Sequence, residues 1–281
     1  MDRRRVSPRL DRTARLLGVD AMERLAAAHV VVLGIGGVGT FAAEALVRAG
    51  VGRVALVDGE RIEETNANRQ LHALDGAFGR SKAEEMAARL RRVSPAARVD
   101  AIVERYSEET AARLVPAGVS FVVDAMDTVV AKLHVVRRCL ELGIPIVTAL
   151  GAARRIDPTA IQVTDLSASH TDPFAKDVRK YLRRRHGIAA TEETGVLAVW
   201  SVEEPRRTLA LAGDEEGIPG AAASEQRRRE PKVFGSAAFV TGAFGLAAAA
   251  AVVQRLAGAI PRTPRVLSEA EASRRRKRRA R

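Results

Sequence analysis

Short apolar segments alternate with amphipathic ones from residue 18 to residue 153. Continuous runs of valine, leucine and isoleucine are typical of buried strands, whereas apolar residues spaced three and four apart are typical of helices that pack on a sheet. The expected strands lie within 29–39, 53–59, 97–104, 119–127 and 144–153. The expected helices lie within 18–28, 40–50, 80–95 and 107–115, together with a helix that contains Cys139. This alternation predicts an α/β fold with a Rossmann-like, doubly wound and mostly parallel sheet.

The pattern becomes looser after residue 153. Residues 154–187 combine an alternating strand with a basic helix, and 203–232 have the composition of a long charged loop. We expect one domain over 1–258, with a nucleotide site mainly in 29–153 and a substrate-side extension over 154–258. Residues 259–281 are expected to form a basic, disordered tail.

Residues 233–254 form a 22-residue stretch without a charged side chain, "VFGSAAFVTGAFGLAAAAAVVQ". Its length would suffice to cross a bilayer. Alanine and glycine dominate it, however, and this composition is only marginally favourable for insertion. The preferred interpretation is a core helix that packs closely through small residues, and contact with a membrane is the alternative.

The net charge of +12 is concentrated at the two ends of the chain. The segment "RRRKRRAR" (274–281) carries seven positive charges, and "MDRRR" adds more at the start. Such arms are compatible with solubility alone or with an electrostatic grip on RNA or an acidic partner. Aromatic residues make up only 4% of the chain, which argues against a stacking platform for single-stranded nucleic acid.

Cys139 is the single cysteine, so the chain can form neither an internal disulfide nor a paired-cysteine zinc site. A small buried side chain is the preferred interpretation of Cys139, and a reactive thiol is the alternative. No apolar segment follows the basic start, as it would in a secretory signal peptide. We therefore expect a cytoplasmic location.

The segment "GIGGVG" (34–39) fits the dinucleotide pattern G-x-G-x-x-G. Small residues allow a tight turn and let the backbone approach phosphates, which bind at the start of the following helix. The glycines of this pattern are Gly34, Gly36, Gly37 and Gly39. Asp58 ends the second strand, where a carboxylate accepts hydrogen bonds from ribose hydroxyls. The pattern indicates a nucleotide but does not separate an NAD enzyme from an ATP enzyme.

The polar cluster "TNANRQ" (65–70) favours ATP. Arg69 can stabilise charge on a transferring phosphate, and Asn66, Asn68 and Gln70 can orient oxygen atoms. A hydride-transfer site has no evident use for such a second phosphate clamp. In ordinary proteins the same residue types are common in surface loops.

Two further segments place charged residues near this cluster. Lys82 begins the helix after "GRS" and can hold a phosphate, although a plain surface lysine is the alternative. The segment "DAMD" ends a strand; we expect Asp124 and Ala125 to border the nucleotide and Asp127 to hold magnesium, with a helix N-cap as the alternative for Asp127.

Together these segments resemble the adenylation domain shared by the ThiF, MoeB and HesA proteins and the ubiquitin-activating enzymes, over roughly residues 9–165. The resemblance implies that ATP binds without a Walker loop, and that a substrate carboxylate attacks the α-phosphate to give an acyl adenylate and pyrophosphate. It assigns the glycines and Asp58 to nucleotide and ribose, and Asp127 to magnesium. It assigns the phosphates to Asn66, Arg69 and Lys82. Arg12, in "RLDRTARLLG", resembles an arginine that reaches the neighbouring protomer's ATP, which implies a homodimer.

The later segments resemble one branch of this family, which dehydrates threonylcarbamoyladenosine in tRNA, and they extend the match to about residue 257. The resemblance implies adenylation of a carboxylate beside the anticodon and ring closure within the same substituent, which needs no cysteine nucleophile. The basic segment 176–187 is then a candidate tRNA contact, a solvated basic face being the alternative. Residues 190–232 depart most from the branch's pattern.

Several alternatives stay open at this point. The chain could activate the C-terminal carboxylate of a small ubiquitin-like sulfur-carrier protein, although such enzymes commonly carry zinc-binding cysteine pairs. A sulfur-relay protein is a further candidate partner. The glycine loop alone would also fit an NAD-dependent oxidoreductase, and a non-enzymatic RNA- or membrane-binding module with an inactive nucleotide fold is the fourth hypothesis.

Overall fold

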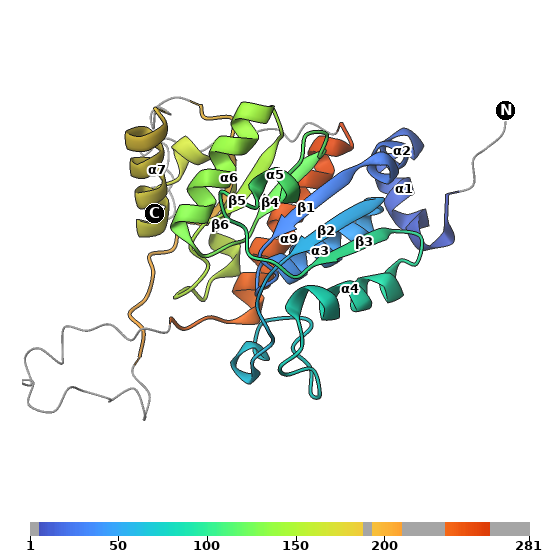
Figure 1. Cartoon of the computed structure of the whole chain (residues 1–281), viewed down its shortest axis with the longest axis horizontal. Coiled ribbons are helices and arrows are strands. Elements are labelled where there is room, and N and C mark those ends of the chain that lie inside the picture. The colour runs from blue at the N-terminus through green and yellow to red at the C-terminus, as the bar shows by residue number, and fades with distance from the viewer. Residues whose placement is uncertain (1–5, 188–192, 210–233, 259–281) are drawn as a thin grey trace, which may run out of the picture.

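A seven-stranded sheet with the order β3-β2-β1-β4-β5-β7-β6 forms the centre of the protein (Figure 1). The computed structural model describes residues 6–187, 193–209 and 234–258. The strands are β1 (His29–Leu33), β2 (Arg53–Val57), β3 (Arg98–Ile102), β4 (Phe121–Asp124), β5 (Ile146–Ala149), β6 (Ile161–Asp165) and β7 (Leu197–Ser201). The helices are α1 (Asp11–Leu17), α2 (Val19–Ala27), α3 (Gly39–Ala49), α4 (Lys82–Val93), α5 (Ala111–Leu114), α6 (Val129–Leu142), α7 (Pro173–His186) and α9 (Ala238–Leu256). Short 3-10 turns are η1 (Pro8–Leu10), η2 (Glu64–Asn66), η3 (Pro158–Ala160) and η4 (Leu166–Ala168).

Strand direction confirms the expected mostly parallel sheet. Strand β1 pairs in parallel with both β2 and β4, and the chain order of the strands reverses between β1 and β4. Only β6 runs antiparallel within this sheet, at its edge beside β7. In open sheets of this kind ligands bind beyond the carboxyl ends of the strands where the order reverses. The loops after β1 and β4 are therefore the first place to look for a site.

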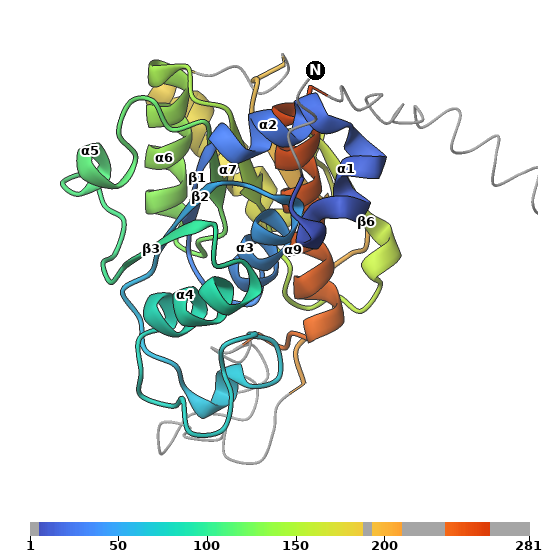
Figure 2. The ribbon, with the colours of Figure 1, turned by 90° about the vertical axis from the view of Figure 1, so that its right-hand side faces the viewer.

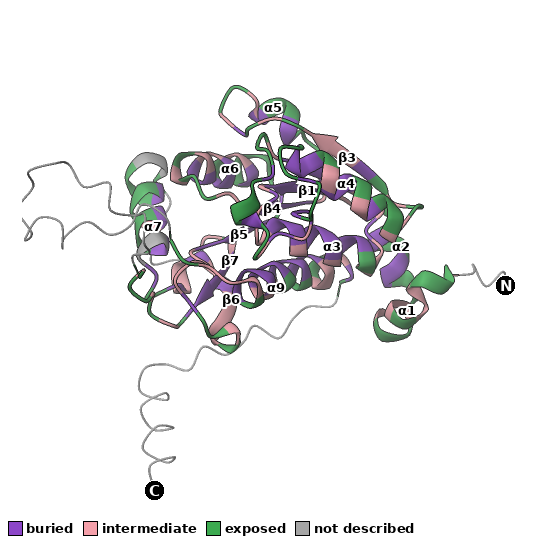
Figure 3. Cartoon of the chain, turned by 90° about the horizontal axis from the view of Figure 1, so that it is seen from below, coloured by how far each residue is buried: buried purple, intermediate pink, exposed green. Residues whose placement is uncertain are grey.

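Two hydrophobic cores cover the two faces of the sheet. One core contains residues of α2, α3, α4 and α9, and the other contains residues of α5, α6 and α7. Figures 2 and 3 show α6 on the opposite side of the sheet from α3 and α9. The five inner strands are almost entirely buried, as expected for apolar runs covered on both faces, whereas the edge strands β3 and β6 are partly exposed.

The uncharged segment 233–254 contributes α9, which packs mainly on α3 and also touches β5, β6 and β7. Glycines make this close approach possible: a Cβ at Gly242 would lie 3.1 Å from the Phe41 ring, and one at Gly245 would collide with the carbonyl oxygen of Val38. By length and hydropathy α9 is the one helix among the described residues that could cross a membrane, and half of it is buried in the protein. This packing agrees with the preferred interpretation of a core helix.

Two local predictions differ from the structure. Strand β7 was not expected, yet it is buried and lies between β5 and β6. The helix expected over 107–115 is reduced to α5, because the Thr110 hydroxyl oxygen accepts the Ser107 N–H and holds this segment in a turn. Most of the loop expected over 203–232 and all of the tail expected over 259–281 lie outside the described residues.

Candidate functional site

The glycine loop joins β1 to the N-terminus of α3 in a conformation that requires glycine. Gly34 has a positive φ of 85°, and a Cβ there would lie 2.8 Å from the Ala125 carbonyl oxygen. A Cβ at Gly39 would collide with the carbonyl oxygen of Gly34. Gly36 borders open space, and its nearest neighbour would be the Gln70 amide nitrogen at 3.9 Å. The loop thus forms a cradle with a helix N-terminus at its base, which suits a phosphate group.

Both backbone polar groups of Ile35, inside this loop, are held by side chains. Its N–H donates to Asp58 Oδ2 at 2.7 Å, and its carbonyl oxygen lies 2.9 Å from His72 Nε2. Asp58 Oδ1 also accepts the N–H of Glu60 at 2.8 Å. Asp58 therefore shapes the glycine loop in addition to its predicted contact with the ribose.

His72 belongs to the site but was missed by sequence reasoning. Its side chain is buried, and burial lowers its pKa below the ordinary value, with the nearby charge of Lys82 acting in the same direction. A neutral imidazole can donate from Nε2 to Ile35, while its Nδ1 has no partner among the described residues. The only sequence signal was its position two residues after Gln70.

The polar cluster 65–70 lies beside the cradle, as the surroundings of Gly37 in the glycine loop show. A Cβ at Gly37 would lie 3.2 Å from Arg69 Cγ and 3.0 Å from the hydroxyl of Thr241 on α9. Arg69 is half-buried and donates from Nη1 to the Thr65 carbonyl oxygen at 2.9 Å and to Asn68 Oδ1 at 2.8 Å. Among the described residues its Nη2 and Nε have no hydrogen-bond partner, so they remain for a ligand.

The three amide side chains of the cluster have different surroundings. Asn66 is buried, and its Oδ1 accepts the N–H of Glu63 as part of the cap of η2. Asn68 donates to the carbonyl oxygen of Ser236, which connects the cluster to the segment before α9. Gln70 is buried, and its Oε1 has no partner in the described part of the chain. An unpaired buried oxygen beside an open cradle fits a group that orients a ligand.

Lys82 begins α4 and is buried, so the alternative of a plain surface lysine is wrong. Its Nζ donates to Glu60 Oε2 at 2.7 Å. This hydrogen bond is the chief reason why the pKa of Glu60 lies below its ordinary value. Glu60 was not predicted as part of the site, and it holds the lysine that is expected to meet phosphate.

The two aspartates after β4 have different roles from each other. The Asp124 carboxylate is fully buried, with Lys132 Nζ 2.6 Å and the Thr148 hydroxyl 2.6 Å from its Oδ2. The expectation that the Asp124 side chain borders the nucleotide is therefore corrected. Its Oδ1 accepts the N–H of Met126 at 3.2 Å, so it shapes the turn that presents Asp127.

Asp127 is exposed at the end of this turn, and Ala125 lies against Gly34 through its backbone. Asp127 Oδ1 accepts a long hydrogen bond, 3.4 Å, from the Thr128 hydroxyl. The described residues contain no group of three or more acidic, histidine or cysteine side chains suited to a metal ion. Asp127 fits magnesium only as a single protein ligand, with phosphate and water supplying the others.

Arg12 is not brought to this cluster within one chain. It lies exposed on α1, and the neighbouring Leu10 packs near Gly50 at the C-terminus of α3. The glycine loop is at the other end of that 11-residue helix, about 16 Å away at a rise of 1.5 Å per residue. The contact of Arg12 with a neighbouring protomer's site stays a prediction.

Cys139 is buried on α6, as its preferred interpretation required. Burial raises its pKa to about 12, and the charge of Asp124 acts in the same direction. Almost none of the thiol is then ionised at neutral pH, so Cys139 is a poor nucleophile. The cluster around the cradle contains no other thiol, because the chain has no second cysteine.

Comparison with known proteins adds three findings. The model of the ThiF family matches residues 10–280. A tRNA threonylcarbamoyladenosine dehydratase from Bacillus subtilis is 44% identical over 67% of this chain and 72% of its own length. A sulfur carrier protein adenylyltransferase from Thermus thermophilus is 36% identical over only 50% of this chain and 51% of its own length.

Solved structures agree with these findings. The crystal structure of Escherichia coli tRNA N6-threonylcarbamoyladenosine dehydratase in complex with ATP is 37% identical and covers 90% of this chain and 96% of that one, with a TM-score of 0.77. The complex of the same protein with AMP has a TM-score of 0.78.

Proposed function

The chain belongs to the ThiF family, and on this premise we propose that it is the ATP-dependent enzyme that dehydrates threonylcarbamoyladenosine in tRNA to its cyclic form. One observation carries the proposal: a chain that matches the Escherichia coli dehydratase over nearly its whole length also has a glycine cradle facing Arg69 and Gln70. The ATP and AMP complexes of that relative fit an enzyme that consumes ATP and releases AMP.

This proposal takes the place of two earlier hypotheses, that the chain is an NAD-dependent oxidoreductase and that it is a binding module with an inactive nucleotide fold. Activation of a sulfur-carrier protein is the less supported alternative, because the sulfur-carrier relative covers only half of the chain. The absence of a second cysteine also weighs against it.

The reaction has two steps. A carboxylate oxygen of the threonylcarbamoyl group attacks the α-phosphorus of ATP, and pyrophosphate leaves with the electron pair of the broken bond. An atom of the same substituent then attacks the activated carbonyl carbon and loses a proton, while AMP leaves with the former carboxylate oxygen. The net loss from the nucleoside is one water. Ring closure needs no protein nucleophile because the attacking atom is already held beside the carbonyl.

Each group around the cradle has a proposed part in this chemistry. The backbone of Gly34, Gly36, Gly37 and Gly39 and the N-terminus of α3 receive phosphate, and Asp58 accepts hydrogen bonds from the ribose. Arg69 places two unpaired nitrogen atoms toward a phosphate, where charge increases in the transition state. Lys82 adds a point charge, Asn66, Asn68 and Gln70 orient oxygen atoms, and Ala125 borders the nucleotide through its backbone.

Magnesium and a second protomer complete the proposal. Asp127 would hold a magnesium ion, which supplies positive charge to the departing pyrophosphate. A homodimer would supply Arg12 from the partner, since one chain leaves Arg12 far from its own cradle. We infer a cytoplasmic enzyme that acts on tRNA; a sulfur-relay protein and contact of α9 with a membrane are secondary proposals.

The test is mass spectrometry of nucleosides from tRNA that bears threonylcarbamoyladenosine, after incubation with the protein, ATP and magnesium. We expect a nucleoside lighter by one water that requires ATP and is lost in Arg69→Ala. Arg137→Ala is the matched control, because Arg137 is an exposed arginine on α6, on the other face of the sheet. If the tRNA is unchanged although ATP binds, the substrate is a protein carboxylate instead.

A further inference from the structure

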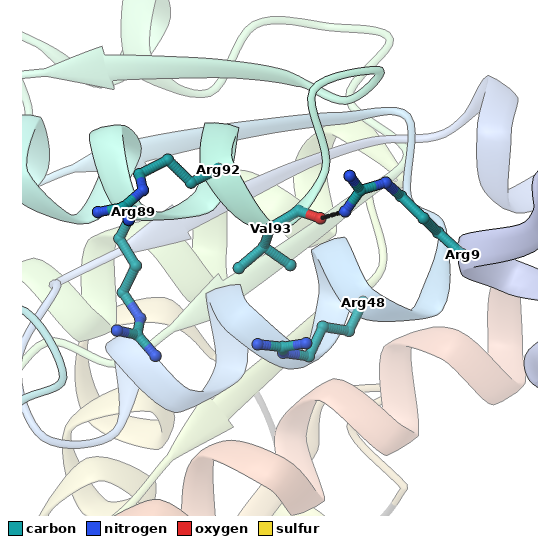
Figure 4. Close-up of a pocket in the computed structure, with 5 residues that line it drawn as sticks. All are labelled: Arg9, Arg48, Arg89, Arg92 and Val93. Atoms are coloured by element: carbon teal, nitrogen blue, oxygen red, sulfur yellow. Dashed lines mark hydrogen bonds between the residues drawn. The ribbon is translucent and has the colours of Figure 1, made fainter.

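A basic cavity of about 440 Å³ lies between η1, α3 and α4, apart from the cradle. Arg9 of η1, Arg48 of α3 and Arg89 and Arg92 of α4 surround Val93 (Figure 4). These arginines come from segments that are far apart in the sequence, and the fold brings them together. None of them belongs to the residues assigned to the adenylation site.

The cavity holds more positive charge than its acidic partner balances. Glu44 pairs with Arg48 at 2.7 Å and with Arg89 at 2.6 Å, so one carboxylate serves two guanidinium groups. Arg9 donates to the Val93 carbonyl oxygen at 3.1 Å. The Arg92 side chain makes no hydrogen bond or ion pair within the described residues. Four arginines against one carboxylate give the cavity a net charge of +3, and Arg9 and Arg92 have no acidic partner in the described part of the chain.

Helix ends explain part of this arrangement. The C-terminal turns of α3 and α4 favour cations, and the bond from Arg9 to Val93 satisfies one carbonyl at such an end. A helix terminus carries only about half a negative charge, which is less than the excess here. Four guanidinium groups that share one carboxylate repel one another, so the arrangement favours an added anion.

Phosphate is the anion that suits the cavity. Arginine binds phosphate oxygens through two parallel N–H donors, and this geometry is the reason for its use in nucleic-acid recognition. The cavity lies along the same helices as the cradle but toward their other ends: Arg89 is seven residues after Lys82 on α4, about 10 Å along the axis. A phosphate bound there belongs to a ligand that extends well beyond the adenylation site.

We propose that the cavity formed by Arg9, Arg48, Arg89 and Arg92 binds backbone phosphates of the tRNA outside the modified nucleotide. This inference rests on the proposed function. The net charge of +3 in the cavity favours the polyanionic backbone of RNA as its occupant. The cavity then contributes to affinity for tRNA without taking part in the chemistry.

The test compares two double variants of the whole chain. Arg48→Gln with Arg92→Gln removes two charges of the cavity and leaves the pair of Arg89 with Glu44 intact. The control, Arg113→Gln with Arg137→Gln, removes two exposed arginines from α5 and α6 on the opposite face of the sheet. Affinity for tRNA is measured by fluorescence anisotropy at several salt concentrations, and AMP release is measured against tRNA concentration.

We expect the cavity variant to bind tRNA at least tenfold more weakly than the control at low salt. The slope of log affinity against log salt should fall by about one for each phosphate that the variant no longer binds. The KM for tRNA should rise, while kcat and ATP affinity stay unchanged. If the two double variants bind tRNA equally, the proposal is wrong.

Two further outcomes would also overturn it. If inorganic phosphate stabilises the wild type against heat but not the cavity variant, and tRNA affinity is unchanged, the site takes a free anion. If sedimentation shows that only the cavity variant loses its dimer, the cavity is an interface between copies. Affinity for tRNA can be measured without turnover, so this test is separate from that of the proposed function. If the cavity variant alone loses affinity for tRNA but the wild type forms no cyclic nucleoside, the cavity proposal is supported and the proposed reaction is refuted.

Discussion

His72 donates from Nε2 to the carbonyl oxygen of Ile35, 2.9 Å away, while Asp58 accepts the N–H of the same residue, so the two side chains together fix the glycine loop. Removing the imidazole leaves a buried carbonyl oxygen without its partner. That loss costs about 1–3 kcal/mol of stability and frees the loop to move. We expect His72→Ala to weaken ATP binding about tenfold in calorimetric titrations, whereas His170→Ala, at an exposed histidine, leaves it unchanged. Equal ATP affinity in both variants would show that His72 does not orient the loop.

Acid should destabilise the protein through His72 and His29. Burial is the chief cause that lowers the pKa of both imidazoles below the ordinary value of 6.5, so the unfolded chain binds more protons than the folded one. The contribution of the two neutral imidazoles to the free energy of unfolding is complete above pH 6.5. It is lost as the pH falls through the lower pKa values that the two side chains have in the folded state. Urea unfolding between pH 8 and pH 5 measures this slope. His72→Gln should make the slope shallower, and an unchanged slope would contradict the assignment.

Lys132 should be essential for stability, because it forms a fully buried ion pair with Asp124. Lys132→Met leaves the Asp124 carboxylate buried without its counter-charge, which costs about 3–5 kcal/mol. The double variant with Asp124→Asn should recover part of this loss, since both charges are then absent. Urea unfolding of both variants, with exposed Lys180→Met as the control, gives the comparison. A loss as small as that of the control would show that the pair contributes little.

Cys139 should be dispensable for the reaction. Its thiol is buried and its pKa is raised to about 12, so we expect no reaction with Ellman's reagent until the protein unfolds. Cys139→Ala should retain cyclisation within about twofold of the wild-type rate, although the small cavity costs some stability. Rapid labelling of the native protein together with loss of activity in Cys139→Ala would restore the alternative that Cys139 is a reactive thiol.

Much of the fold was accessible from the sequence because its signals are local. The strands that become β1, β2 and β4 are continuous apolar runs, and glycines or acidic residues mark their ends. Strand β7 was missed for a different reason. Its position between β5 and β6 depends on pairing with segments distant in the chain, and no short pattern specifies such a position.

The residues of the candidate site also differ in whether a local sequence signal marks them. Gly34, Arg69 and Lys82 could be proposed from the sequence because each lies in a short recognisable motif, either in a loop or at the start of a helix. Asp124 was placed wrongly because alternation along a strand does not reveal that its carboxylate meets Lys132 inside the protein. His72, Glu60 and Thr241 were missed, since each acts only through a tertiary contact.

The contact between Thr241 and Gly37 has a consequence for biosynthesis. A nascent chain forms β1, the glycine loop and α3 long before the ribosome has made α9, which covers that loop and much of the adjacent core. Domains fold largely as units during synthesis, and exposed apolar surface invites aggregation. The α3 face of this protein therefore stays uncovered until the ribosome has made α9, and the glycine loop reaches its final surroundings only then.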